Sequence, residues 1–362
     1  EMRKNLFATT PGIIIVGAVI GLIAVWLQKL GNPANMGICV ACFERDVAGG
    51  LGLHRAAIVQ YLRPEIMGLV FGSLAAAIAT REFKPRGGSA PIVRFVLGMI
   101  AAMGALVFLG CPWRAILRLA GGDGNAILGL AGLATGIWFG TLFFKKGYSL
   151  GRSNSQSVVS GALFPVIAVC LLLLYLIFPQ IPDQPQSGPL FYSVKGPGSQ
   201  HAPFIASLGL AFIIGIFAQR SRFCTMGAFR DLFLFRYTHL FLGLAAMFAA
   251  AFIANALTGG LKFGFEGQPV AHSDFLWNYL GMVTAGLAFA LAGGCPGRQL
   301  FMAGEGDSDA GIFALGMLVG AAMAHNLGTA SSGTGIGVYG MQATIIGFAV
   351  CLIIGFVHSK KA

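Results

Sequence analysis

The sequence predicts an all-α polytopic membrane protein with about ten apolar spans, arranged in two inverted-topology halves with short re-entrant helices. Three observations lead to this fold class: the composition, a series of long apolar runs, and an internal repeat. Of the 362 residues, 56% are hydrophobic and only 10% are charged, whereas a typical soluble domain is about 25% charged. A chain this apolar is not disordered, and its 53 glycines follow no Gly-X-Y period, which excludes collagen.

The apolar runs set the number of spans. A helix that crosses a bilayer needs about 20 mostly apolar residues, and successive runs of this kind follow one another along the chain. They cover roughly residues 12–30, 64–80, 91–110, 126–144, 160–178, 203–219, 239–257, 276–293, 310–328 and 339–357. The first run ends in Trp26-Leu27-Gln28-Lys29 without a small-residue cleavage site, so we expect a span and not a cleaved signal.

The longest polar stretch, residues 179–202, is rich in proline. Proline and polar residues at this density indicate a segment outside the membrane. We therefore expect residues 1–178 to form a first membrane repeat and residues 203–362 a second, inverted one, with 179–202 as the linker between them.

The net charge of +11 would suggest nucleic acid in a soluble protein, but the basic residues form no basic helix or stripe. Membrane topology and an anionic substrate explain them better. If the N-terminus is cytoplasmic, two thirds of the 24 basic residues fall on that side. They are Arg3, Lys4, Arg81, Lys84, Arg86, Arg94, Lys145, Lys146, Arg152, Arg220, Arg222, Arg230, Arg236, Arg298, Lys360 and Lys361. This bias predicts a multi-pass protein of the inner (cytoplasmic) membrane with both termini inside.

An internal repeat relates the two halves. Residues 39–46 (CVACFERD) match 224–231 (CTMGAFRD) at Cys, Arg and Asp, and 110–114 (GCPWR) match 294–298 (GCPGR). Gly122-Asp123 likewise matches Gly306-Asp307, in the same order and at nearly the same spacing. An odd number of predicted spans separates the first motif from its copy, so the second copy is inverted, as in many secondary transporters.

Each repeated motif follows an apolar run and contains Gly, Pro or polar residues. Such backbone enters a membrane only where protein or water surrounds it. We expect four segments to meet near the midplane, with Cys39 and Cys111 entering from outside and Cys224 and Cys295 from inside. These four thiols and that of Cys42 are the candidate substrate path, because a thiol is a soft, weakly donating group suited to a sulfur or selenium atom. Nearby helix N-termini would favour a negative charge.

The charged residues of the motifs have two interpretations each. Arg114 and Arg298 either attract the anion at each mouth of the path or are structural. We expect the Arg45–Asp46 and Arg230–Asp231 pairs to be structural, because charges at membrane depth pair with one another. Asp123, Asp307 and Glu305 are expected to cap the helix that follows, with a proton relay as the alternative.

Other residues are expected to be structural. Cys170 and Cys351 lie within long apolar runs and are predicted to be packing residues, and Trp113 an anchor at the membrane interface. The six histidines show no spacing for a metal site, and a zinc site at Cys39 and Cys42 lacks a second pair nearby. We therefore expect no metal and no cofactor.

The motifs resemble the YeeE/YedE family of membrane proteins, which includes thiosulfate permeases, and especially its selenium-associated YedE branch. The motifs are 32–46 (NPANMGICVACFERD), 61–65 (YLRPE), 108–112 (FLGCP) with 118–123 (RLAGGD), and 293–298 (GGCPGR). The resemblance implies an hourglass-like, pseudo-two-fold protein with three thiols on its central path, here Cys39, Cys111 and Cys295. Cys42 is an addition to the simpler pattern. The resemblance also implies a small TusA-like or YedF-like carrier as a cytoplasmic partner.

The function predicted from these residues is uptake of a selenium- or sulfur-containing anion along the thiols, by a transporter and not an enzyme. No Gly-x-x-x-x-Gly-Lys-Ser/Thr loop for ATP occurs in the chain. One alternative keeps the mechanism and makes thiosulfate the substrate. Another is a membrane thiol–disulfide oxidoreductase that uses Cys39 and Cys42, although the copy of this pair has Gly227 in place of the second cysteine.

Overall fold

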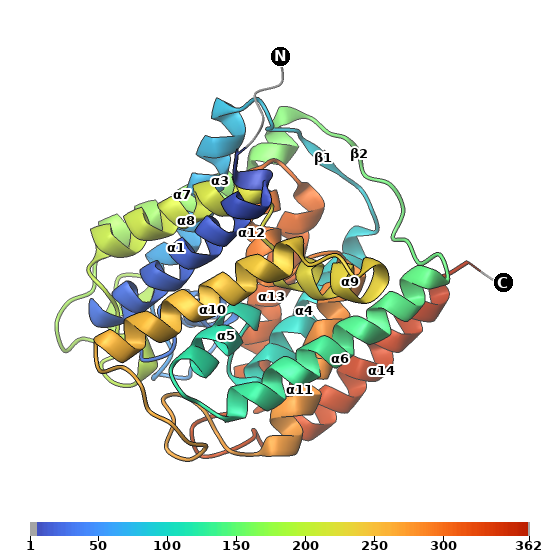
Figure 1. The fold of residues 1–362 in the computed structure, drawn as a ribbon. Coiled ribbons are helices and arrows are strands. Elements are labelled where there is room, and N and C mark those ends of the chain that lie inside the picture. Colours follow the sequence, from blue (N-terminus) through green and yellow to red (C-terminus); the bar gives the residue numbers. More distant parts are fainter. Residues whose placement is uncertain (1–5, 361–362) are drawn as a thin grey trace.

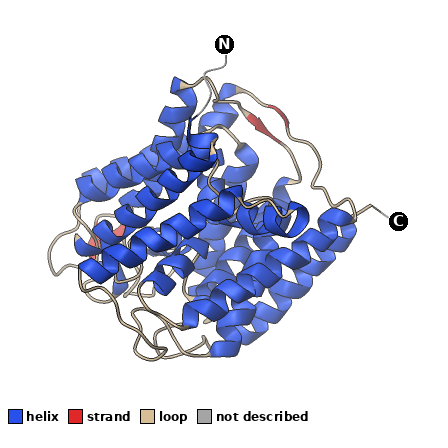
Figure 2. Ribbon diagram, in the orientation of Figure 1, coloured by secondary structure: helices blue, strands red, loops and turns tan. Residues whose placement is uncertain are grey.

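The computed structural model describes residues 6–360 and consists almost entirely of helices (Figures 1 and 2). The helices are η1 (Leu6–Ala8), α1 (Thr10–Lys29), α2 (Val40–Gly50), α3 (Pro64–Ala79), α4 (Pro91–Phe108), α5 (Pro112–Ala120), α6 (Asn125–Lys145), α7 (Val158–Ile177), η2 (Pro197–Ser199), α8 (Phe204–Ser221), α9 (Thr225–Phe235), α10 (His239–Leu257), α11 (Phe275–Ala292), α12 (Pro296–Gly304), α13 (Ser308–Asn326) and α14 (Gly340–Val357). Two short antiparallel ribbons pair β1 (Arg86–Gly87) with β2 (Asn154–Ser155), and β3 (Gln186–Ser187) with β4 (Leu190–Phe191).

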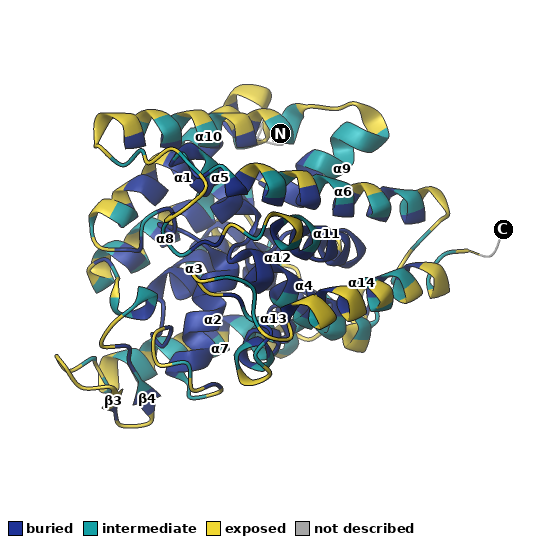
Figure 3. Ribbon diagram, turned by 90° about the horizontal axis from the view of Figure 1, so that it is seen from below, coloured by how far each residue is buried: buried dark blue, intermediate teal, exposed yellow. Residues whose placement is uncertain are grey.

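The predicted fold class is confirmed. Within residues 6–360, 9 segments are long and apolar enough to cross a membrane, and α3 is a shorter apolar helix. Each of the expected runs coincides with one long helix: α1, α3, α4, α6, α7, α8, α10, α11, α13 or α14. The chain is therefore a multi-pass, all-α membrane protein. Figure 3 shows the arrangement that a bilayer requires, with outward faces of α10 and α14 exposed and the interior buried.

The shorter helices α2, α5, α9 and α12 have 11, 9, 11 and 9 residues. All 11 residues of α2 are buried, and this helix lies in the interior in Figure 3. The same order of helix lengths occurs in α1–α7 and in α8–α14: the second and the fifth helix of each set are short, and the others are longer.

Helices from the two parts of the chain pack in pairs: α1 with α10, α3 with α8, α4 with α13, and α6 with α11. Glycine allows these close approaches. A Cβ at Gly17 of α1 would lie 1.9 Å from the Gly243 carbonyl oxygen of α10, and one at Gly72 would lie 2.0 Å from that of Phe212. The two parts therefore share one core, which holds the short helices in fixed positions.

Helix α1 begins and α14 ends on the same side of the bundle, which we call the N-terminal face (Figure 1). The backbone N–H of Ser149, beyond α6, donates to the His358 carbonyl beyond α14, and the Tyr148 hydroxyl donates to Leu291 at the end of α11. The loop of residues 178–203 lies on the opposite side, which we call the linker face. Of the basic residues used to predict the topology, Arg3, Lys4 and Lys361 lie outside the described residues.

Candidate functional site

A cysteine immediately precedes each of the four short helices. The Cys39 Sγ accepts a hydrogen bond from the Cys42 backbone N–H at 3.3 Å, and the Cys224 Sγ accepts one from Gly227 at the same distance. These thiols take the place of the usual Ser or Asp caps at the starts of α2 and α9. In α5 and α12 the cysteine is followed by proline at the first helical position, which lacks the N–H that a cap would satisfy.

Three thiols and one guanidinium form the linker-side cluster: Cys39, Cys42, Cys111 and Arg114. The Cys111 backbone N–H points at the Cys39 Sγ over 3.5 Å, and the Arg114 Nη1 lies 3.7 Å from the Cys42 Sγ. All four residues are buried. The N-terminal ends of α2 and α5, each with partial positive charge, therefore meet beside a full positive charge.

The hydrogen-bond acceptors around the Arg114 guanidinium are backbone carbonyls and the Cys42 thiol. Its guanidinium donates to Leu109, to Asn35 at 3.3 Å, to Pro269 at 3.2 Å and to Val270 at 3.1 Å. Among residues 6–360 it forms no ion pair, whereas Arg118 one turn later pairs with Asp123 at 2.6 Å. Arg114 was expected at an open mouth, but it is 0% exposed, because residues 269–270 of the loop between α10 and α11 cover it.

Two thiols form the N-terminal-side cluster. The Cys224 Sγ and Cys295 Sγ lie 3.8 Å apart, where the starts of α9 and α12 meet. Arg298, which follows Cys295 by three residues, pairs with Glu305 at 3.2 Å. A cavity of about 430 Å³ adjoins Cys224 and opens toward the N-terminal face. Its lining includes Arg222, Arg230, Arg298, Tyr237 and His239.

Trp113 lies between the two clusters. It is 1% exposed, and its ring is 5.7 Å from that of Phe223, the residue before Cys224, and 5.9 Å from that of Phe301 in α12. The expectation of an interface anchor is therefore wrong. The indole is a core side chain at the point where the short helices converge, and sequence reasoning missed it because the apolar surroundings are supplied by the other half of the chain.

The acidic residues of the motifs make specific contacts. Arg45 and Asp46 pair at 2.7 Å, and Arg63, which sequence reasoning did not single out, adds a second bond to Asp46 at 2.7 Å. Arg230 and Asp231 pair at 2.8 Å. The Arg230–Asp231 pair is neutral, whereas Asp46 with its two arginines keeps one positive charge next to the linker-side cluster.

The expected caps are only partly present. Asp307 accepts from the backbone of Ala310 at 3.1 Å and caps α13, and Asp123 accepts from Asn125 at 2.9 Å at the start of α6. Glu305 instead pairs with Arg298, because it lies at the end of α12, two residues before the cap of α13.

The two remaining cysteines differ from each other. Cys351 is buried as expected, but Cys170 is exposed on α7, so its assignment as a packing residue is wrong. All seven cysteines are free thiols in this structure. Within the described part of the chain, no group of three or more His, Cys, Asp or Glu side chains is placed to hold a metal ion.

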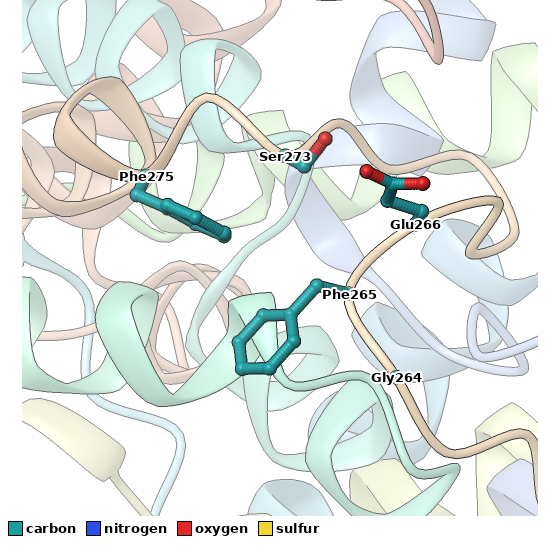
Figure 4. A pocket seen from close by; sticks show the side chains of 5 residues that line it. All are labelled: Gly264, Phe265, Glu266, Ser273 and Phe275. Atoms are coloured by element: carbon teal, nitrogen blue, oxygen red, sulfur yellow. The ribbon is translucent and has the colours of Figure 1, made fainter.

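A separate cavity of about 630 Å³ lies on the linker face between α10 and α11, lined by Gly264, Phe265, Glu266, Ser273 and Phe275 (Figure 4). Its one ionisable side chain is acidic, which is unsuited to an anion. None of the candidate thiols lines it, so we do not include it in the site.

The chain is similar to a sulfur-transport family model, to a thiosulfate transporter and to a probable transporter. Residues 220–355 match the family described as "Sulphur transport". The thiosulfate transporter TsuA of Spirochaeta thermophila is 32% identical over 106 residues, which make up 29% of this chain and 32% of TsuA. The probable transporter YedE of Escherichia coli K12 is 25% identical over 277 residues, 70% of this chain and 62% of YedE. The matches thus span about a third and three fifths of these relatives, and they support the YeeE/YedE family that the motifs resemble.

Proposed function

We propose that this chain is an inner-membrane transporter that takes up a sulfur- or selenium-containing anion by passing it along thiols in a central constriction. One observation carries the proposal: four helix N-termini, each preceded by a cysteine, converge in pairs beside buried guanidinium groups. The matched relatives, a thiosulfate transporter and a probable transporter, support transport as the activity.

The electrostatics favour an anion. A buried guanidinium without a carboxylate is costly, and carbonyl dipoles compensate it only in part. An anion beside Arg114 would complete that compensation, and the starts of α2 and α5 would add to the attraction. In the N-terminal-side cluster, Glu305 already neutralises Arg298, so an anion is held more weakly there and can leave.

The thiols favour a chalcogen. Sulfur and selenium atoms are large, polarizable and poorly hydrated, so thiol contacts replace their lost water at low cost. Cys39, Cys42 and Cys111 would receive this end of the ion, and Cys224 and Cys295 would receive it next. Each contact is weak, which passage requires.

Two substrates remain in the proposal. Thiosulfate is the substrate named for TsuA, while the motifs around Cys39 and Cys42 resemble the selenium-associated branch. We also propose that the N-terminal face is cytoplasmic, since it carries most of the basic residues. A TusA-like or YedF-like carrier would then receive the ion from the cavity beside Cys224.

Uptake of labelled thiosulfate into proteoliposomes tests this function. Cys111→Ala and Cys295→Ala should each abolish uptake, whereas Cys351→Ala, a buried cysteine of α14 outside both clusters, should leave it unchanged. Competition by selenite and other selenium species separates the two substrates. Wild-type rates in both cluster variants would refute the thiol path. Cycling of a Cys39–Cys42 disulfide during turnover would favour the oxidoreductase instead.

A cysteine introduced at Lys195 or at Lys146 tests the orientation. In intact cells, a membrane-impermeant maleimide should label the first and spare the second, since Lys195 lies on the linker face and Lys146 on the N-terminal face. The reverse pattern would invert the proposed topology.

A further inference from the structure

The indole N–H of Trp113 is buried and has no hydrogen-bond acceptor within reach among residues 6–360. A buried tryptophan N–H usually finds a partner, because an unpaired buried donor costs free energy. Phenylalanine, a smaller aromatic side chain, would avoid that cost. The contacts within the folded chain therefore do not explain why a hydrogen-bond donor is buried at this position.

The position of the N–H indicates what use the donor has. Trp113 is the second residue after Cys111, in the first turn of α5, and the ring reaches toward the first turn of α12. A Cβ placed on Gly297, the second residue after Cys295, would lie 3.2 Å from the Trp113 Cζ2 and 3.4 Å from its Cε2. The third contact, with Cη2 at 3.5 Å, shows that the benzene side of the indole faces Gly297. The buried N–H lies on the adjoining edge of a ring that packs between the linker-side and N-terminal-side clusters.

Trp113 and Gly297 occupy the same place in the two Gly-Cys-Pro-x-Arg motifs. The first motif supplies the ring and the second supplies the space for it, because even a methyl group at position 297 would be in tight contact with the indole. The ring between the clusters, with its N–H donor, therefore comes from the first half of the chain.

We propose that the Trp113 N–H donates a hydrogen bond to an oxygen of the transported anion as the ion passes between the linker-side and N-terminal-side clusters. This inference rests on the proposed function and adds the group that recognises the oxygen end. The thiols contact the chalcogen end, and the indole, which is a donor only, contacts an oxygen that carries charge. The preferred substrate class is therefore an oxyanion with a terminal chalcogen, such as thiosulfate, over an oxygen-free chalcogenide.

Two variants at position 113 test this inference in proteoliposomes with thiosulfate. Trp113→Phe removes the donor, and 3-benzothienylalanine at this position keeps the ring shape and replaces the N–H with sulfur. Each should raise the KM for thiosulfate by about tenfold, the loss of one charge-assisted hydrogen bond. In the benzothienyl variant, which keeps the ring volume, the thermal stability of the ligand-free protein should stay unchanged or rise, because no hydrogen bond of the empty protein is lost. A structural role would predict the opposite, lower stability at constant KM.

The outcomes separate this inference from the proposed function. Unchanged KM in both variants, with uptake still abolished by Cys111→Ala and Cys295→Ala, would overturn the role of Trp113 and leave the thiol path intact. Absence of thiosulfate and selenium uptake by the wild-type protein would overturn both. A raised KM in Trp113→Phe but not in the benzothienyl variant would show that ring size matters and not the donor, which also refutes the inference.

Discussion

The two thiol clusters begin from the same motif, Gly-Cys-Pro-x-Arg, and end in different environments. In the linker-side cluster, Arg114 is fully buried and bonds to backbone carbonyls and to the Cys42 thiol. In the N-terminal-side cluster, Arg298 pairs with Glu305, and Cys224 adjoins a cavity of about 430 Å³. The backbone motif thus brings a thiol to the start of a short helix. Residues outside the motif decide whether the arginine is buried without a carboxylate or is paired with one beside a cavity.

The two clusters also differ in how they can be reached from the two faces of the protein. Residues 269–270 cover Arg114 on the linker face, whereas the N-terminal face leads to Cys224 through the cavity. The described conformation therefore covers Arg114 on the linker face and leaves Cys224 beside a cavity on the other side.

The largest effect on uptake should come from replacing the arginine of the linker-side cluster, compared with replacing the arginine of the other cluster. Arg114→Met removes the guanidinium that lies 3.7 Å from the Cys42 thiol and has no carboxylate partner among residues 6–360. It should lower thiosulfate uptake by about 100-fold or more. Arg298→Met should reduce uptake less, because Glu305 already cancels that charge. Arg298→Met with Glu305→Gln is the matched control that leaves no carboxylate unpaired. Equal losses in the two single variants would show that the clusters do not differ in charge.

Thiol reactivity should differ by about tenfold or more between the clusters, because a modifying reagent must reach the sulfur. A small methanethiosulfonate applied to the Cys170→Ala protein should modify Cys224, which is 6% exposed, faster than Cys39 or Cys42, which are both 0% exposed. Mass spectrometry of digested protein measures each rate. Faster labelling of Cys39 would mean that the linker face is the open one.

A smaller effect is expected from the loop over Arg114. Val270 has φ +49°, a left-handed conformation that is strained for a β-branched residue by about 1–2 kcal/mol. Val270→Gly should relieve this strain, stabilise the closed loop and raise the melting temperature by a few degrees, while slowing uptake several-fold.

Ser273→Gly in the same loop is the control for Val270→Gly, since Ser273 does not have a positive φ. Differential scanning fluorimetry and initial uptake rates measure the two effects. Faster uptake in Val270→Gly would show that this loop does not limit access to Arg114.

The sequence alone predicted the spans well, because each long helix is marked by its own apolar run. The repeated cysteines also proved informative, since a cap is a local feature fixed by the next few residues. The contacts that distinguish the clusters were not predictable in this way. The Arg114 guanidinium donates to the Pro269 carbonyl, which lies 155 residues later in the sequence. The space for Trp113 comes from Gly297 in the other half of the chain. Cys170 lies in a run that is apolar on every face, so nothing in the sequence indicated which face would be exposed.

The cavity beside Cys224 determines where the membrane voltage acts. Water in a cavity open to one side carries the potential of that side, so the voltage falls mainly across the buried layer between Cys224 and the loop over Arg114. An ion that crosses this layer does nearly all of its electrical work there, about 2.3 kcal/mol per charge for each 100 mV. The layer contains Trp113 and the buried thiols and guanidinium of the linker-side cluster, which concentrates the field on these side chains.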